Sequence, residues 1–193
     1  MNQPTQQQLP LNFRFLEERL VPDLDLKSTA TDNSTVNLSK IEGTAVLVIQ
    51  PGSSAPFQTK SGWLDELKKI LGAAGCTGEL NCYKDKFSRL QDLGVKLFAM
   101  SGQSFDQLQA VKEHLELPFE LLSDDSLLFL EGLQLRALQY PSYDMQGTNP
   151  GPPRVTLVIQ DGVIKKALVA NWKEEGGITA NVDDVVSFAE GLQ

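Results

Sequence analysis

The sequence predicts an α/β fold in which helices flank a mixed central β-sheet. Short, continuous apolar runs at residues 45–49 and 95–100 are typical of buried strands. Segments between the apolar runs carry apolar residues at helical spacing, which predicts that strands and helices alternate. An Asp-Gly pair at residues 161–162 separates two further apolar runs and predicts an antiparallel hairpin.

The N-terminal part of the chain predicts few regular elements. Apolar positions within residues 11–20 precede Pro22 and predict a short helix that leads into extended chain. Residues 29–37 are polar and predict turns. The first buried strand closes at Pro51, where we expect a loop, and a short helix follows over residues 63–71.

The remaining elements alternate up to the C-terminus. After Cys76, apolar residues recur at helical spacing (Leu80, Tyr83, Phe87 and Leu90), so a helix should begin near the cysteine and end by Gly94. We expect further strands at 95–100, 119–122, 155–159 and 163–169, and further helices at 105–115, 126–133 and 182–192. This order is that of a thioredoxin-like fold. It predicts one domain over residues 1–193, with a short polar extension at residues 1–10.

Composition excludes several classes of function. The net charge of −8 and the pI near 4.7 give no basic surface, so we expect no nucleic-acid partner and no attraction to anionic membranes. The first ten residues lack the apolar run of a secretory signal, and we expect a cytoplasmic protein. With two cysteines, Cys76 and Cys82, and the single His114, a disulfide scaffold or a metal site is not expected.

Cys76 stands where a thiol can become a nucleophile. The reactive form of cysteine is the thiolate, which a helix N-terminus and a nearby cation stabilise. Cys76 falls in the first turn of its predicted helix, on the core-facing side. Glycines at positions 72, 75 and 78 let a small substrate approach the backbone there. The alternative is a small apolar cysteine of the core.

Cys82 lies six positions after Cys76 on the same predicted helix. Six helical residues separate the two by about 9 Å along the axis. A disulfide requires Cα atoms within about 7 Å, so the bond could form only if the helix unwinds locally. Gly78 weakens this part of the helix by about 1 kcal/mol relative to alanine.

Four segments together resemble the Q-type peroxiredoxins, the bacterioferritin-comigratory-protein group of the AhpC/TSA superfamily. They are Gly75-Cys76-Thr77-Gly78-Glu79 with Cys82-Tyr83-Lys84-Asp85, then residues 95–101, 117–124 and 154–159. The resemblance implies a cofactor-free thiol peroxidase with Cys76 as the peroxidatic cysteine and Arg154 as the residue that stabilises the thiolate and the peroxide. It further implies a substrate pocket formed by Pro51, Ala73, Gly75, Thr77 and Glu79. Without the resemblance, Arg154 reads as a surface arginine that opens a strand.

The sequence also departs from the family pattern. Pro51 and Cys76 lie 25 positions apart, where the family usually has about seven residues between them, so residues 57–74 form an insertion. Ala73 occupies the position of a family threonine, and the hydroxyl that would bond the peroxide is missing. Cys82 falls one residue later than the family's resolving cysteine. Either Cys82 or an external thiol therefore attacks the sulfenic acid.

The resemblance implies a hydroperoxide substrate and thioredoxin, glutaredoxin or glutathione as the reductant, in a monomer or a homodimer. The missing threonine and the long insertion favour a second interpretation, a thioredoxin-like binding or scaffold module without activity. A disulfide oxidoreductase is disfavoured because no Cys-x-x-Cys occurs.

Several other residues have simpler structural interpretations. His114 fits a solvated helix face better than a catalytic base. The pairs Asp124-Asp125 and Asp183-Asp184 are expected to supply negative charge at helix starts rather than to bind metal. Three aromatic residues either cover the site or pack within the loops that carry them: Trp63 in the insertion, and Tyr140 and Tyr143 in an expected loop over residues 139–153.

Overall fold

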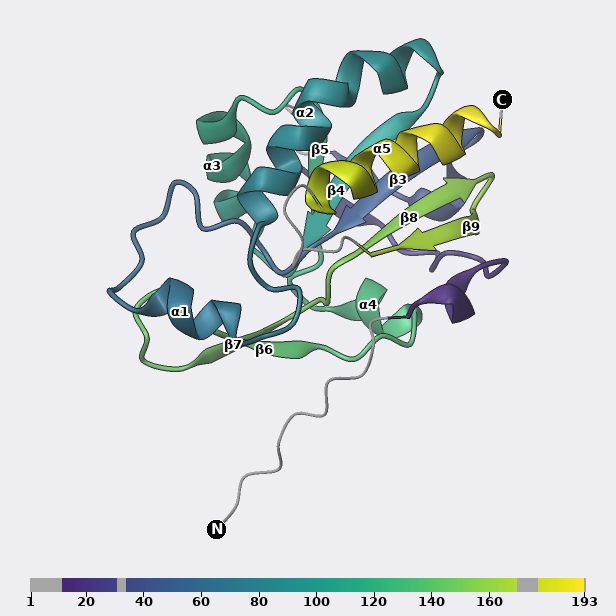
Figure 1. Cartoon of the computed structure of the whole chain (residues 1–193). Coiled ribbons are helices and arrows are strands. Elements are labelled where there is room, and N and C mark those ends of the chain that lie inside the picture. The colour runs from purple at the N-terminus through teal and green to yellow at the C-terminus, as the bar shows by residue number, and fades with distance from the viewer. Residues whose placement is uncertain (1–11, 31–33, 170–176, 193) are drawn as a thin grey trace.

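A seven-stranded sheet forms the centre of the protein in a computed structural model that describes residues 12–30, 34–169 and 177–192 (Figure 1). Its strand order is β2-β1-β5-β4-β3-β8-β9. The strands are β1 (Leu26–Ser28), β2 (Thr35–Val36), β3 (Thr44–Ile49), β4 (Lys96–Ser101), β5 (Glu120–Ser123), β8 (Val155–Gln160) and β9 (Val163–Leu168). The predicted extension at residues 1–10 lies outside the described residues.

The sheet is mixed, as predicted. β3 pairs in parallel with β4, and β4 in parallel with β5. β8 runs antiparallel to β3, with Ile49 opposite Val155, and turns at Asp161-Gly162 into β9. The side chains of β3 are buried on both faces, because helices cover one face and chain segments the other, and this explains its continuous apolar run.

Helices α2 (Cys76–Asp92), α3 (Phe105–Leu115) and α5 (Gly177–Glu190) cover one face of the sheet, and Val46 and Val48 of β3 pack against them (Figure 1). The other face carries α4 (Leu128–Gly132) and the N-terminal segment with the 3-10 helix η1 (Arg14–Leu16). The fold is thus the predicted thioredoxin-like sandwich. Its site end is the carboxyl end of β3, where α2 begins.

A smaller layer lies beyond this end of the sheet, where α1 (Trp63–Lys68) packs beside a two-stranded sheet of β6 (Leu138–Pro141) and β7 (Thr148–Gly151) (Figure 1). A separate hydrophobic cluster packs α1 against the β6–β7 sheet. It consists of Trp63, Leu67, Ala73 and Tyr140. The expectation that residues 139–153 form an irregular loop was therefore wrong. The prolines of the segment obscured the hairpin, because proline is unusual inside strands.

Two predicted helices differ from the structure. The segment at residues 11–20 forms only the three-residue η1, and Leu20 in it is 75% exposed, because Leu16 and Phe13 alone pack into the core there. The last helix begins at Gly177 instead of residue 182. Asp183 and Asp184 therefore lie within α5 and not at its start, and Asp183 pairs with Lys86 of α2 at 2.7 Å.

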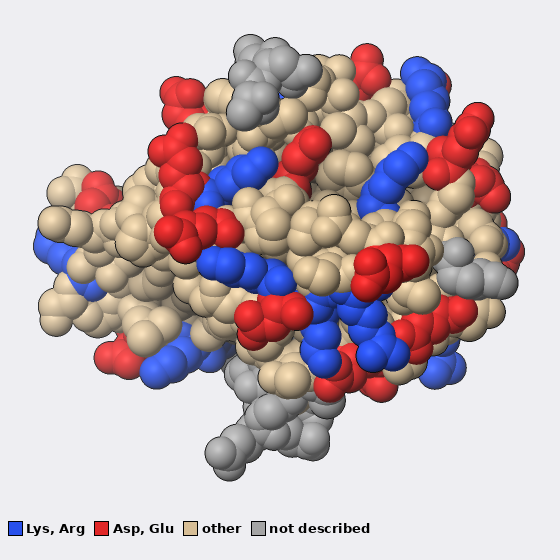
Figure 2. Space-filling model, turned by 90° about the horizontal axis from the view of Figure 1, so that it is seen from above, with Lys and Arg blue, Asp and Glu red and all other residues tan. Residues whose placement is uncertain are grey.

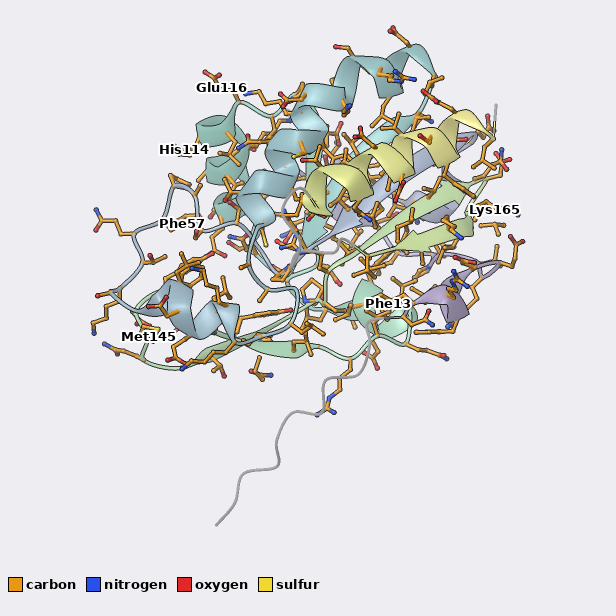
Figure 3. All side chains as sticks on the ribbon, viewed as in Figure 1. Phe13, Phe57, His114, Glu116, Met145 and Lys165 are labelled. Atoms are coloured by element: carbon orange, nitrogen blue, oxygen red, sulfur yellow. The ribbon has the colours of Figure 1, made fainter. Side chains whose placement is uncertain are left out.

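Asp124 does serve a helix start, as predicted. Its carboxylate accepts hydrogen bonds from the amides of Phe129 (3.1 Å) and Leu130 (3.0 Å) at the beginning of α4. Burial raises the pKa of Asp124, and these amides oppose the shift. His114 is exposed on the outside of α3, as expected for a solvated helix face (Figure 3).

The surface is polar and mixed in charge. On the face shown in Figure 2, acidic and basic side chains are interspersed, without one large basic patch. Among the described residues, no helix has the length and apolar character needed to cross a membrane. Within the same residues, histidine, cysteine and carboxylate side chains do not gather into groups of three that could hold a metal ion.

Candidate active site

Cys76 is the first residue of α2, as the sequence predicted. Gly75 precedes it with φ at 100°, a left-handed conformation that strains any residue with a side chain. A Cβ at position 75 would also come within 2.8 Å of Cδ1 of Ile178 in α5. Glycine at position 75 therefore allows α5 to pack closely against the start of α2. Cys76 then lies at the positive end of a helix of 17 residues.

Arg154 reaches the same point from the sheet. It precedes β8, and its side chain lies on the α2 face, as does that of Thr156 two residues later, which accepts a hydrogen bond from Tyr83 of α2. The Arg154 Nη2 atom lies 3.0 Å from the Cys76 Sγ atom. Arg154 is only 1% exposed, so the interpretation of a surface arginine is wrong.

Besides the Cys76 sulfur, the guanidinium of Arg154 bonds to three other groups. Its Nε donates to the carbonyl of Gly72 (2.8 Å), and its Nη2 also donates to the carbonyl of Ala74 (3.1 Å). Its Nη1 donates to the carboxylate of Glu79, which is equally buried. The last residues of the insertion thus orient the arginine, because their carbonyls fix its planar fork.

Two negative groups offset the cost of burying the Arg154 cation. Burial disfavours the cation of Arg154, but the Cys76 thiolate and the Glu79 carboxylate outweigh it, so the pKa of the guanidinium lies above its ordinary value. Burial raises the pKa of Glu79, and the guanidinium opposes that shift. A permanent cation thus faces the Cys76 sulfur, where it stabilises a thiolate.

Cys76 is only 5% exposed, but its sulfur contacts polar groups and is not surrounded by apolar side chains alone. Its Sγ accepts from Arg154 and, as a thiol, can donate to the carbonyl of Ala73 at 3.6 Å. The interpretation of Cys76 as a plain core cysteine does not fit these polar contacts.

Cys82 is not part of this group. It is half-buried, and its Sγ lies 3.7 Å from Oγ1 of Thr179 in α5. The helix between the two cysteines is intact, so a disulfide requires a conformational change.

The predicted pocket residues surround Cys76 in different ways. Glu79 and the backbone of Ala73 contact the Cys76–Arg154 pair directly. The Thr77 hydroxyl lies 2.9 Å from that of Ser53, two residues after Pro51. Pro51 thus lies in the loop that meets the first turn of α2.

Three further polar groups lie near Cys76. Sequence reasoning missed Ser53 and Gln103, and it considered Tyr143 only as an aromatic residue that could cover the site. Ser53, Gln103 and the hydroxyl of Tyr143 form one hydrogen-bonded group beside Thr77. In the sequence, only Gly52 hints at this group. Its φ is 134°, and a Cβ at this position would lie 2.8 Å from Oε1 of Gln103. A glycine in the loop that follows a buried strand can mark such a close approach.

Aromatic residues cover the outer side of the site. Tyr143 stacks on Phe57 at 5.5 Å and meets Trp63 edge-on at 5.4 Å. Burial, and then the charge of Cys76, raises the pKa of Tyr143 to about 12, so its hydroxyl is neutral. This hydroxyl donates to the carbonyl of Ser53 at 3.0 Å, in the loop that meets the first turn of α2. The aromatic residues therefore belong to the site wall as well as to the packing of the hairpin on α1.

The fold and the site define a redox thiol protein of the thioredoxin-like class, with one cysteine at a helix start against a buried arginine. The chain belongs to the Redoxin family, which it matches over residues 16–186. Within it, the chain is a Q-type peroxiredoxin of the AhpC/TSA superfamily, as the resemblance implied.

Its relatives include two plant proteins named chloroplastic peroxiredoxin Q. That of Suaeda salsa is 25% identical over 178 residues, which cover 91% of this chain and 68% of the relative. That of Sedum lineare is 26% identical over 160 residues, with coverages of 82% and 70%.

Solved structures share the fold. Peroxidoxin BcpB of Mycobacterium tuberculosis superposes with a TM-score of 0.66 at 16% identity, covering 92% of this chain and 97% of that one. Peroxiredoxin Q of Xanthomonas campestris gives a TM-score of 0.64 at 17% identity, with coverages of 90% and 95%.

Proposed function

We propose that the protein reduces hydroperoxides with the Cys76 thiolate and protects its host against oxidants. The observation that carries this proposal is the 3.0 Å contact between Cys76 Sγ and Arg154 Nη2 at the start of α2. A helix N-terminus and a buried guanidinium act on one sulfur, and both favour its ionised form. A binding module without activity has no need for such a buried charged group, which is costly to maintain.

The first step is a displacement at oxygen. The Cys76 thiolate attacks one peroxide oxygen, an S–O bond forms, and the O–O bond breaks. Cysteine is oxidised to the sulfenic acid, and the peroxide is reduced to an alkoxide or hydroxide that takes a proton from water and leaves as alcohol or water. Arg154 stabilises the negative charge as it moves from sulfur to the leaving oxygen.

The experiment that tests the function uses one equivalent of hydrogen peroxide on the reduced protein. Peroxide should disappear in a one-to-one ratio with protein, and dimedone should label Cys76 in the Cys82→Ser variant. The Cys76→Ser variant serves as the control and should leave peroxide untouched. If the wild-type protein consumes peroxide no faster than this control, the proposed function is wrong.

The second step concerns the sulfenic acid, and we propose that Cys82 resolves it. Water is lost when the Cys82 thiol attacks the sulfenic sulfur and the disulfide forms. The first turns of α2 must unwind for this, and Gly78 makes that easier because glycine destabilises a helix interior. Thr179 of α5, which contacts Cys82, must also move away.

Mass spectrometry of the oxidised protein checks this step. After one equivalent of peroxide, the wild-type protein should lose two hydrogens, and a tryptic digest should contain a peptide pair that links Cys76 to Cys82. The Cys82→Ser variant should gain one oxygen instead and should react with peroxide at the wild-type rate, since Cys82 does not contact Cys76. A gain of oxygen in the wild-type protein would show that an external thiol completes the cycle.

The reductant completes the proposed cycle. We propose thioredoxin, glutaredoxin or glutathione, because each supplies a thiol that can reduce a disulfide or a sulfenic acid. We also propose a reducing compartment such as the cytoplasm, because two cysteines are too few for a disulfide scaffold. A monomer or a homodimer remains our prediction for the assembly.

A further inference from the structure

The first turn of α2 lacks the usual support of a helix start. Gly75 is its N-cap and offers no side chain to bond the free amides. Among the described residues, two side chains from outside the helix hydrogen-bond to side chains of this turn. Arg154 bonds to Cys76 and Glu79, and Ser53 bonds to Thr77.

Ser53 is an unusually fixed partner. It is 1% exposed, and its amide donates to Oε1 of Gln103 at 3.0 Å while its carbonyl accepts from Nε2 of Gln103, also at 3.0 Å. The side-chain amide of Gln103 thus pairs with both backbone groups of Ser53, as a neighbouring strand would. The hydroxyl of Tyr143 donates to the same carbonyl at 3.0 Å.

Gln103 is itself anchored to the sheet. It is 8% exposed and follows the end of β4. Its carbonyl accepts from the hydroxyl of Ser123 at the end of β5 (2.8 Å), and its amide donates to the hydroxyl of Ser101 (3.2 Å). Gly52 leaves room for its side chain. A continuous path of hydrogen bonds therefore connects the ends of two central strands to Thr77, the residue directly after Cys76.

We propose that Ser53, fixed by Gln103, is a positioning residue: through the Thr77 hydroxyl it holds the first turn of α2 in place, and so keeps Cys76 against Arg154. Neither Ser53 nor Gln103 needs to touch the substrate. The inference rests on the proposed function for its kinetic consequence, although the restraint on the helix is a property of the reduced protein alone.

The test removes the hydroxyl and then restores it. Thr77→Val keeps the shape of the side chain but loses the bond, whereas Thr77→Ser keeps the bond. We expect Thr77→Val to lower the second-order rate constant of Cys76 with hydrogen peroxide about threefold to tenfold, the effect of one hydrogen bond, and Thr77→Ser to retain most of the wild-type rate. Ser39→Ala, which removes a hydroxyl bonded to Asn37 Oδ1 at 2.7 Å near the opposite end of the sheet, should change nothing.

A double-variant comparison shows whether the two hydroxyls act together. Ser53→Ala alone should slow the reaction as much as Thr77→Val, and the double variant should be no slower than either single variant. Effects that multiply would overturn the proposal, because they would mean that each hydroxyl acts on its own. Wild-type rates for both single variants would overturn it as well.

Amide hydrogen exchange separates this proposal from the peroxidase function. In the reduced protein, the amides of Glu79 and Leu80 should exchange about threefold to tenfold faster in Thr77→Val than in the wild type or Thr77→Ser. This measurement needs no peroxide. If Thr77→Val exchanges faster but the wild-type protein has no peroxidase activity, the proposed role of Ser53 and Thr77 stands and the proposed function is wrong. If the wild-type protein is an active peroxidase but Thr77→Val exchanges at the wild-type rate, the proposed role of Ser53 and Thr77 is wrong.

Discussion

Replacing Arg154 with methionine is expected to slow the reaction of Cys76 with hydrogen peroxide by about 100-fold. Methionine fills a similar volume but removes the cation that lies 3.0 Å from the Cys76 sulfur. The thiolate then loses a charge-assisted hydrogen bond, and the leaving oxygen loses the donor that stabilises its charge. Single-turnover kinetics at neutral pH, followed by peroxide consumption, measures the change.

Two further variants sharpen this comparison. Arg154→Lys keeps a charge but cannot bond the carbonyls of Gly72 and Ala74 and the Glu79 carboxylate at once, so it should recover only part of the rate. Arg89→Met removes an arginine that pairs with Glu190 on the surface, and it should react like the wild type. Equal rates for Arg154→Met and the wild type would remove Arg154 from the mechanism.

The architecture could be predicted where a single physical signal dominates. The apolar run of β3 and the Asp-Gly turn between β8 and β9 each identify an element from local sequence, and the mixed sheet was confirmed. The N-terminal helix and the loop at residues 139–153 were predicted wrongly. There the structure depends on tertiary packing, since η1 packs onto the sheet face and β6–β7 is held by α1.

The site could be predicted in part for the same reason. Cys76 at a helix start follows from periodicity, and the resemblance points to Arg154, 78 positions later. The carbonyls of Gly72 and Ala74 and the bond between Ser53 and Thr77 leave no pattern in the sequence, because they arise only when the insertion closes against β8 and the loop after β3 meets α2. The resemblance placed Glu79 in the substrate pocket, and in the structure its carboxylate accepts a hydrogen bond from Arg154 beside Cys76.

The buried pair of Glu79 and Arg154 leads to the second large effect, which concerns stability. Glu79→Leu is expected to lower the free energy of unfolding by about 3 kcal/mol, because it leaves the guanidinium buried without its carboxylate partner. Urea denaturation of the reduced protein at neutral pH measures the loss. Glu190→Gln, which removes the charge from the surface pair with Arg89, should change stability by less than about 1 kcal/mol.

The double variant Glu79→Leu/Arg154→Met separates stability from activity. Removing both charges leaves no unpaired ion in the interior, so most of the stability lost in Glu79→Leu should return. The reaction with peroxide should nevertheless stay as slow as in Arg154→Met, because the cation beside Cys76 is still missing. A stable but unreactive double variant would show that the buried ion pair serves the thiolate and is not needed to fold the protein. If Glu79→Leu proves as stable as the wild type, the thiolate alone balances the charge of Arg154.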